Sequence, residues 1–238
     1  MASSSRKRVV NRLPAERRIS DIMRAARTVF AEKGYHDALI SDIAERAGMV
    51  EGNIYRFFTN KRDLLVRVVE DWFEEIIVND DEQFAGIRGV WNRIRFVVHQ
   101  HLVTIRREPS LSRLFFQELR SDPAYRQTRL FELNQIYTHR MIDIVREAAA
   151  SGEFRTDLSP ALVRDMVYGC IEHHTWAFLR NEGEFDIDQT ADSVTEIVYN
   201  GLVTRHDATR EFDVALTRLE NIANRLETKI HLKDAINK

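Results

Sequence analysis

The sequence predicts an all-α protein with an N-terminal three-helix helix-turn-helix domain and a larger helical body. Only 9 of its 238 residues are Gly and 4 are Pro, so the residues that usually separate short strands are scarce. Apolar residues recur at steps of three and four, as on one face of an α-helix, without the two-residue alternation of a half-buried strand. We expect a basic flexible arm at 1–14, the helix-turn-helix domain at 15–66 and the helical body at 67–238.

The composition excludes a disulfide-stabilised or membrane-spanning protein. Cys170 is the single cysteine, so the chain cannot form an internal disulfide. No apolar run approaches the roughly 18 residues that a membrane span requires. The first residues are polar and basic where a secretory signal peptide would be apolar. We therefore expect a reduced, soluble, cytoplasmic protein with no membrane partner.

Positive charge is concentrated at the N-terminal end. Residues 1–67 contain 14 Lys and Arg against 8 Asp and Glu, a balance of +6, whereas the remainder contains 21 against 29, a balance of −8. A basic end on an acidic chain indicates a surface for a polyanion, although an ordinary solvated surface would explain it equally simply. The arm at 1–14 could enter a DNA minor groove or remain a solvated tail.

The first helix is expected from about 15 to 33. Gly34 follows it as a C′ residue, because glycine tolerates the positive φ that ends many helices. The apolar residues that share its buried face are Ile19, Ile22, Met23, Ala26, Val29 and Phe30.

Two short helices come next, at about 40–47 and 51–58, joined by a tight turn at Gly48. This arrangement is a helix-turn-helix, whose second helix fits the major groove of DNA. The expected N-cap residues are Leu39 and Val50. Neither side chain has an oxygen, so each helix lacks a cap worth about 1 kcal/mol.

The same region resembles a known family of DNA-binding proteins, the TetR/AcrR repressors. The matching residues keep fixed spacing without gaps between about 15 and 66. They are Ile43-Ala44-Glu45-Arg46-Ala47-Gly48, Gly52-Asn53-Ile54-Tyr55-Arg56-Phe57-Phe58, Asn60-Lys61 and Leu64-Leu65. The family usually has Ser or Thr where this chain has Leu39 and Val50, and Glu51 opens the second short helix where a neutral or basic residue is more usual.

The resemblance implies that double-stranded operator DNA is a partner and that the matching residues contact it. Those residues are Gly52, Asn53, Tyr55, Phe57 and Lys61, to which we add Arg56. A hydroxyl and an ammonium suit phosphate oxygens, which fix register, whereas an amide can also read a base edge. Phe57 has no group to offer a phosphate, so a packing role is an equal alternative.

The body is expected to be helical throughout, with Asn60 or Thr59 capping its first helix. The expected helices lie near 61–79, 84–107, 110–120, 124–151, 159–181, 187–205 and 209–234. The resemblance implies a homodimer in which helices 159–181 and 187–205 pair across a two-fold axis. Its candidate dimerisation residues are Met166, Val167, Ile171, Val194, Ile197, Val198 and Leu202. Helix 209–234 could pack on its own subunit or on the partner.

Bulky residues on the central helices are candidates for a ligand pocket, with Phe96, Phe115, Tyr137 and Trp176 foremost. The stretches 112–120 and 152–158 resemble the fatty-acid-degradation branch of the family, which responds to long-chain acyl-CoA. That resemblance implies an acyl-CoA effector whose phosphates would meet basic side chains. The candidates are Arg106, Arg113 and Arg120.

We expect no cofactor, metal site or catalytic residues. His99 and His101, like the adjacent His173 and His174, diverge on a helix and so do not form a metal-ligand pair. The sequence therefore predicts a ligand-responsive repressor that binds a palindromic operator as a dimer. The alternative is a helical enzyme or scaffold whose basic N-terminus is incidental.

Overall fold

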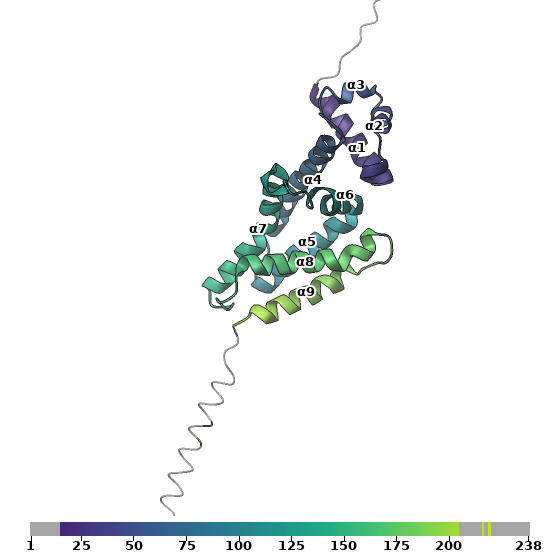
Figure 1. Cartoon of the computed structure of the whole chain (residues 1–238). Helices are drawn as coiled ribbons and strands as arrows, with labels where there is room; N and C mark the ends of the chain where they lie inside the picture. Colours follow the sequence, from purple (N-terminus) through teal and green to yellow (C-terminus); the bar gives the residue numbers. More distant parts are fainter. Residues whose placement is uncertain (1–14, 205–215, 217–218, 220–238) are drawn as a thin grey trace, which may run out of the picture.

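The computed structural model describes residues 15–204 together with Leu216 and Leu219, and it confirms the all-α prediction. Figure 1 shows α1–α3 at one end of an elongated molecule, α4 running away from them, and α8 and α9 at the far end. Within the described residues the one β feature is an isolated bridge between Phe154 and Val203. The nine α-helices of this part are α1 (Ala15–Asp37), α2 (Ile40–Arg46), α3 (Glu51–Ile54), α4 (Lys61–Phe84), α5 (Val90–Arg107), α6 (Pro109–Leu114), α7 (Arg129–Ala150), α8 (Pro160–Leu179) and α9 (Ile187–Leu202).

Several helix boundaries differ from the sequence prediction. α4 continues to Phe84, and α5 begins at Val90, because the chain turns at Gly89 with φ 80°. The expected helix 110–120 divides into α6 and the π-helix η1 (Phe115–Leu119). The expected helix 124–151 begins with the 3₁₀-helix η2 (Tyr125–Gln127) before α7. The predicted arm 1–14 and helix 209–234 lie outside the described residues, apart from Leu216 and Leu219.

The two helices of the helix-turn-helix begin without a side-chain cap, as predicted. Leu39 and Val50 are the N-cap residues of α2 and α3, and neither caps its helix. The Leu39 N–H instead donates to Asp42 Oδ2 at 3.1 Å. α4 is capped by Asn60, whose Oδ1 accepts from the Asp63 N–H at 2.9 Å. This cap fixes the start of the long helix that leaves the N-terminal domain.

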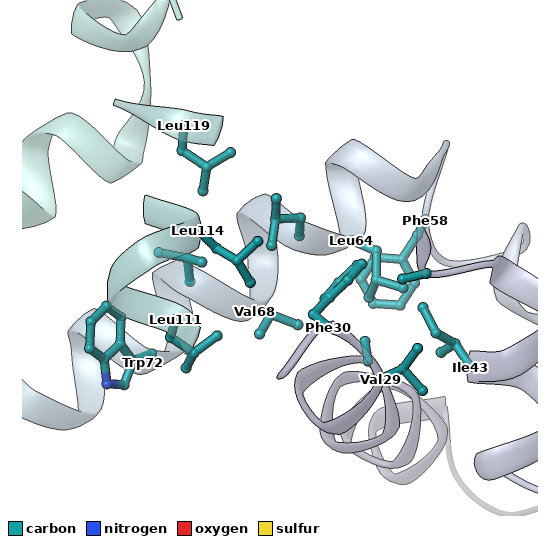
Figure 2. Close-up of a cluster of buried hydrophobic side chains, with 14 of the residues drawn as sticks. Val29, Phe30, Ile43, Phe58, Leu64, Val68, Trp72, Leu111, Leu114 and Leu119 are labelled. Carbon is teal, nitrogen blue, oxygen red and sulfur yellow. The ribbon is translucent and has the colours of Figure 1, made fainter. Parts of the chain in front are cut away.

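The N-terminal domain and the body share one hydrophobic core. Residues of α1–α3, α4, α6 and η1 belong to the same buried cluster, so the core crosses the domain boundary expected at 66. Figure 2 shows Phe30 and Val68 beside Leu114 and Leu111. A second cluster lies farther along the molecule, where α5, α7, α8 and α9 pack together. The recognition region is therefore not packed independently of the body.

Polar contacts reinforce this junction. Arg27 of α1 bonds to Glu108 Oε1, immediately before α6, at 2.6 Å and to Glu75 of α4 at 3.2 Å. The Ser110 hydroxyl donates to the Ala31 carbonyl at 3.3 Å. The C-terminal half of α1 is thus tied to the corner between α5 and α6.

Truncating Leu111 should destabilise the whole molecule. Leu111 is fully buried in the shared core, so Leu111→Ala should lower the free energy of unfolding by about 2–5 kcal/mol. Because the core is shared, unfolding followed by circular dichroism should remain one transition at a lower midpoint. The matched control is Val78→Ala on the exposed side of α4, which should change stability by less than about 0.5 kcal/mol. A separate, unshifted transition of the N-terminal domain would contradict a shared core.

Candidate DNA-binding surface and ligand cavity

The predicted DNA-contact residues form an exposed turn anchored by buried neighbours. α3 spans four residues, and Ile54 fixes it to the core with 1% of its surface exposed. Gly52 is exposed, and a Cβ built on it would meet no atom within 4 Å, so the backbone there can approach DNA closely. Tyr55, at 54% exposure, and Arg56 also reach solvent, while Asn53 is half-buried. The structure thus brings four of the predicted contacts together.

Phe57 and Lys61 occupy a different environment from these four residues. The Phe57 ring is half-buried and packs on the shared core, which fits the packing alternative. Lys61 Nζ donates to the carbonyl oxygens of Tyr35 at 2.7 Å, His36 at 3.1 Å and Ala38 at 2.9 Å. The three protons of the ammonium are thus all used within the protein, and a DNA phosphate would have to compete for them.

Removing the ammonium should therefore cost stability as well as DNA affinity. Lys61→Met keeps the apolar stem but leaves the three carbonyls without their donor, so we expect a loss of about 1–3 kcal/mol in the free energy of unfolding. Operator binding should weaken about equally for all sequences. Arg46→Met is the control, because it removes an exposed ion pair with Glu32 worth about 1 kcal/mol or less. Unchanged stability of Lys61→Met would show that Lys61 is a phosphate contact alone.

A cavity of about 380 Å³ lies in the body, between α4, α5, η1, α7 and α8. This volume is within the range of roughly 300–1,000 Å³ that small-molecule sites occupy. Part of its wall is aromatic, from Trp72 and Phe73 of α4, Phe115 and Phe116 of η1, and Phe131 of α7. The rest is polar, so the cavity suits a ligand with both apolar and polar parts.

Three of the seven predicted pocket residues line this cavity, namely Phe115, Tyr137 and Arg120. The Arg120 guanidinium is paired with Glu172 of α8, another wall residue. The ring of Tyr137 packs edge-on against Phe73 with a centroid separation of 5.9 Å. These residues come from η1, the turn after it and α7, which the fold brings together.

The other four predicted residues lie outside the cavity wall. Phe96 packs against Phe84, and Trp176 lies behind Phe116, with a centroid separation of 6.2 Å. Arg106 bonds to the Phe185 carbonyl, and Arg113 to the Leu179 carbonyl at 3.4 Å. Both arginines therefore bond to the turn between α8 and α9, and their expected role as phosphate-binding residues stays a prediction.

Sequence reasoning missed several polar residues of the wall. His101, Tyr125, Arg126, Asn134 and Arg164 all line the cavity. Their signal was weak, because a helical pattern shows which residues share a face but not which face meets the space between five helices. Within the described chain, Arg126 has no ion-pair partner, whereas Arg164 pairs with Asp165 at 2.8 Å. Arg126 is thus the candidate on this wall for an anionic group.

Burial sets the protonation of two wall residues. Burial, and to a smaller extent the charge of Arg120, lower the pKa of His101 to about 3, so its ring is neutral at pH 7. Its Nδ1 lies 3.0 Å from the hydroxyl oxygen of Tyr137. Burial raises the pKa of Tyr125 to about 12, so its hydroxyl keeps its proton. Both side chains are therefore neutral at pH 7.

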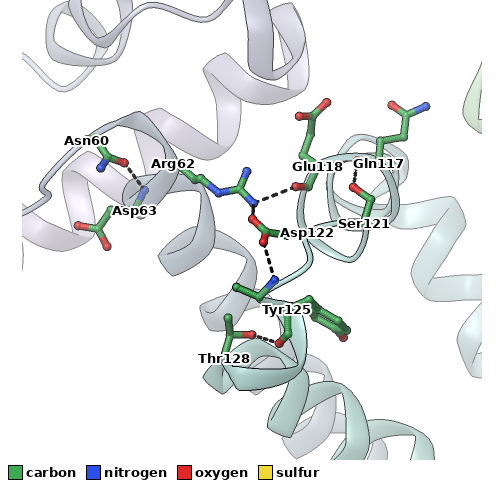
Figure 3. Close-up of polar contacts among 10 residues, drawn as sticks. Asn60, Arg62, Asp63, Gln117, Glu118, Ser121, Asp122, Tyr125 and Thr128 are labelled. Carbon is green, nitrogen blue, oxygen red and sulfur yellow. Dashed lines mark hydrogen bonds and ion pairs between the residues drawn. The ribbon is translucent and has the colours of Figure 1, made fainter.

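One segment forms part of the cavity wall and also touches the N-terminal domain. Residues 115–128 place Phe115, Phe116 and Tyr125 on the cavity. Figure 3 shows Arg62, in the first turn of α4, reaching the Glu118 carbonyl and the Asp122 carboxylate of this segment. The Glu118 carboxylate lies 3.2 Å from His36 Nε2, near the end of α1. A change in the cavity wall can therefore reach α1 and α4 directly.

The predicted dimerisation residues divide into two groups. Met166 and Ile197 are exposed at 64% and 74%, and Leu162, one turn before Met166, is exposed at 51%. Val198 is half-buried. Val167, Ile171, Val194 and Leu202 are instead buried in the core of their own subunit. These four cannot reach a partner, because their helix faces pack on α5 and α7.

The chain is similar to known regulators over most of its length. Residues 22–68 match the family described as "Bacterial regulatory proteins, tetR family", and residues 88–202 match the family described as "Tetracyclin repressor-like, C-terminal domain". The fatty acid metabolism regulator protein of Bacillus subtilis (strain 168) is 27% identical over 181 residues, which are 76% of this chain and 93% of that protein. The HTH-type transcriptional repressor KstR2 of Mycolicibacterium smegmatis is 26% identical over 203 residues, 79% of this chain and 92% of that protein.

Solved structures agree with these matches. The transcriptional regulator FadR from Bacillus subtilis in complex with stearoyl-CoA superposes with a TM-score of 0.68 and 28% identity, covering 76% of this chain and 98% of that one. FadR from Bacillus halodurans gives a TM-score of 0.66 and 25% identity, covering 77% and 98%. A helix-turn-helix joined to a helical body with its own cavity defines a ligand-responsive DNA-binding regulator. The chain belongs to the TetR family of bacterial transcriptional regulators.

Proposed function

We propose that the protein is a cytoplasmic repressor that binds a palindromic operator as a homodimer and releases it when a long-chain acyl-CoA enters the cavity. The observation that carries this proposal is the double contact of residues 115–128, with the cavity on one side and with Arg62 and His36 on the other. A ligand weakens DNA binding only if it favours a conformation that binds DNA less well. A segment that touches both sites gives the ligand a direct means to do so.

The chemistry of the wall supports an acyl-CoA. Aromatic rings from α4, η1 and α7 offer an apolar surface to an acyl chain. Arg126 offers a guanidinium with no competing carboxylate in the described chain, and guanidinium groups bind phosphates through paired hydrogen bonds. Arg120 is less suited to this role because Glu172 neutralises it. The stearoyl-CoA bound to the similar FadR of Bacillus subtilis belongs to the same class of ligand.

A homodimer would cover the exposed apolar residues of α8 and α9, and it would place two recognition helices on the operator. Leu162, Met166 and Ile197 leave an apolar face on α8 and α9, which a second copy of the chain would cover. One short recognition helix reads few bases, so two copies on half-sites about one DNA turn apart increase specificity. A two-fold dimer requires a near-palindromic operator.

A titration of the protein–operator complex tests this proposal. Stearoyl-CoA should weaken operator binding by about tenfold to a hundredfold, which corresponds to 1.4–2.7 kcal/mol of coupling, whereas the free fatty acid and CoA alone should act far less. Arg126→Gln should weaken the response to stearoyl-CoA, while Arg106→Gln, outside the cavity, should not. The proposal fails if none of the three compounds shifts the complex, or if all three shift it equally.

A further inference from the structure

Two exposed side chains at the start of the recognition helix α3 are not engaged within the protein. Val50 and Glu51 lie at the outer end of the molecule, as Figure 1 shows for α3. Val50 is 70% exposed, more than the other exposed large hydrophobic residues of the N-terminal domain, Leu39 at 58% and Tyr55 at 54%. Glu51 is also exposed, and among the described residues its carboxylate has no hydrogen bond or ion pair. Both side chains can therefore contact a partner of the protein.

The backbone that carries these two side chains is held in place. Met49, immediately before them, packs on the shared core, and Ile54, three residues after Glu51, is buried. Between these anchors the Asn53 N–H donates to the Val50 carbonyl at 2.9 Å. Val50 and Glu51 thus have fixed positions at the N-terminal end of the recognition helix. In helix-turn-helix proteins, this end of the helix contacts the edges of the bases.

The chemistry of Glu51 restricts the DNA groups that it can contact. An ionised carboxylate accepts hydrogen bonds without donating any, and the negative charge of phosphates repels it. In the major groove, guanine and thymine present acceptors, whereas cytosine N4 and adenine N6 are donors. Adenine also carries the acceptor N7 beside N6, which is unfavourable to a carboxylate. Cytosine is therefore the base that suits Glu51 best.

Val50 can offer DNA an apolar contact alone. Its side chain has no donor or acceptor, so it neither caps α3 nor binds a phosphate. The apolar group that the major groove presents is the C5-methyl of thymine. Contact with this methyl would remove part of the exposed Val50 surface from water, which is favourable. Because Val50 and Glu51 are consecutive, the bases that they reach should lie in neighbouring base pairs.

We propose that Glu51 and Val50 read bases of the operator. The Glu51 carboxylate accepts a hydrogen bond from cytosine N4, and the methyl groups of Val50 pack on the C5-methyl of a neighbouring thymine. Each operator half-site then contains this cytosine and this thymine. The inference rests on the DNA-binding part of the proposed function and adds a sequence preference to it. Replacing the cytosine should weaken binding about fivefold or more, and removing the thymine methyl should weaken it about threefold.

Selection from a pool of random duplex DNA with the full-length protein tests the cytosine contact. Glu51→Gln keeps the length of the side chain but adds a donor beside the acceptor, which matches N7 and N6 of adenine. At one position of the half-site, the selected base should therefore change from cytosine to adenine. Glu45→Gln is the matched control, because it removes the same charge from an exposed position of α2. This control should select the same half-site as wild type.

Replacing single thymines of the selected operator by uracil tests the thymine contact, because uracil lacks only the C5-methyl. One replacement, beside the cytosine that Glu51 reads, should weaken wild-type binding about threefold. Val50→Ala should bind the thymine and uracil forms of this operator equally. Val78→Ala is the control, because Val78 is exposed on α4, and it should lose as much affinity as wild type.

The possible outcomes separate the inference from the proposed function. If wild type enriches no palindromic site, the proposed repressor function fails and the inference fails with it. If a site is enriched but Glu51→Gln selects the same base at every position, DNA binding stands and the cytosine contact is overturned. If no uracil replacement distinguishes wild type from Val50→Ala, the thymine contact is overturned. A definite site selected by Glu51→Gln also shows that this variant is folded.

Discussion

The packing of α6 and the turns after it against α1 and α4 is the constraint on which the rest of the structure depends. Leu111 and Leu114 lie in the same buried cluster as Phe30 and Val68, so the recognition region shares its core with the body. The same stretch of chain then turns its other side chains toward the cavity. Because protein interiors are close-packed, the cavity wall cannot change shape without affecting the contact with α1 and α4, and the reverse also holds.

This arrangement explains how a small ligand can control a distant DNA contact. The direct path from the cavity passes through residues 115–128 to Arg62 in the first turn of α4 and to His36 near the end of α1. Lys61, next to Arg62, holds three carbonyls at the end of α1 and in the turn before α2. The first turn of α4 is therefore bonded both to the cavity wall and to the helix-turn-helix.

Sequence reasoning succeeded where the signal was local and failed where it depended on packing between distant segments. The helix-turn-helix follows from residue types at fixed spacing, including the uncapped starts at Leu39 and Val50. Periodicity groups Val167 with Ile171 and Leu162 with Met166, but it does not show that the first pair faces its own core and the second faces solvent. Tyr125 and Arg126 were missed because they fall at the start of the expected helix 124–151, and its periodicity does not show that a 3₁₀ turn brings them to the cavity.

The variant Asp122→Asn tests the central claim most directly, through the factor by which acyl-CoA weakens operator binding. The variant removes the charge that pairs with Arg62 but keeps an oxygen for the Ala124 N–H, which now donates to Asp122 Oδ1 at 2.8 Å. The measurement is the ratio of operator Kd with and without saturating acyl-CoA, alongside Asp157→Asn, whose partner Arg155 lies outside this path. We predict a ratio at least about fivefold smaller than wild type, with ligand affinity changed by less than about threefold. A ratio equal to that of wild type and of Asp157→Asn would contradict the account.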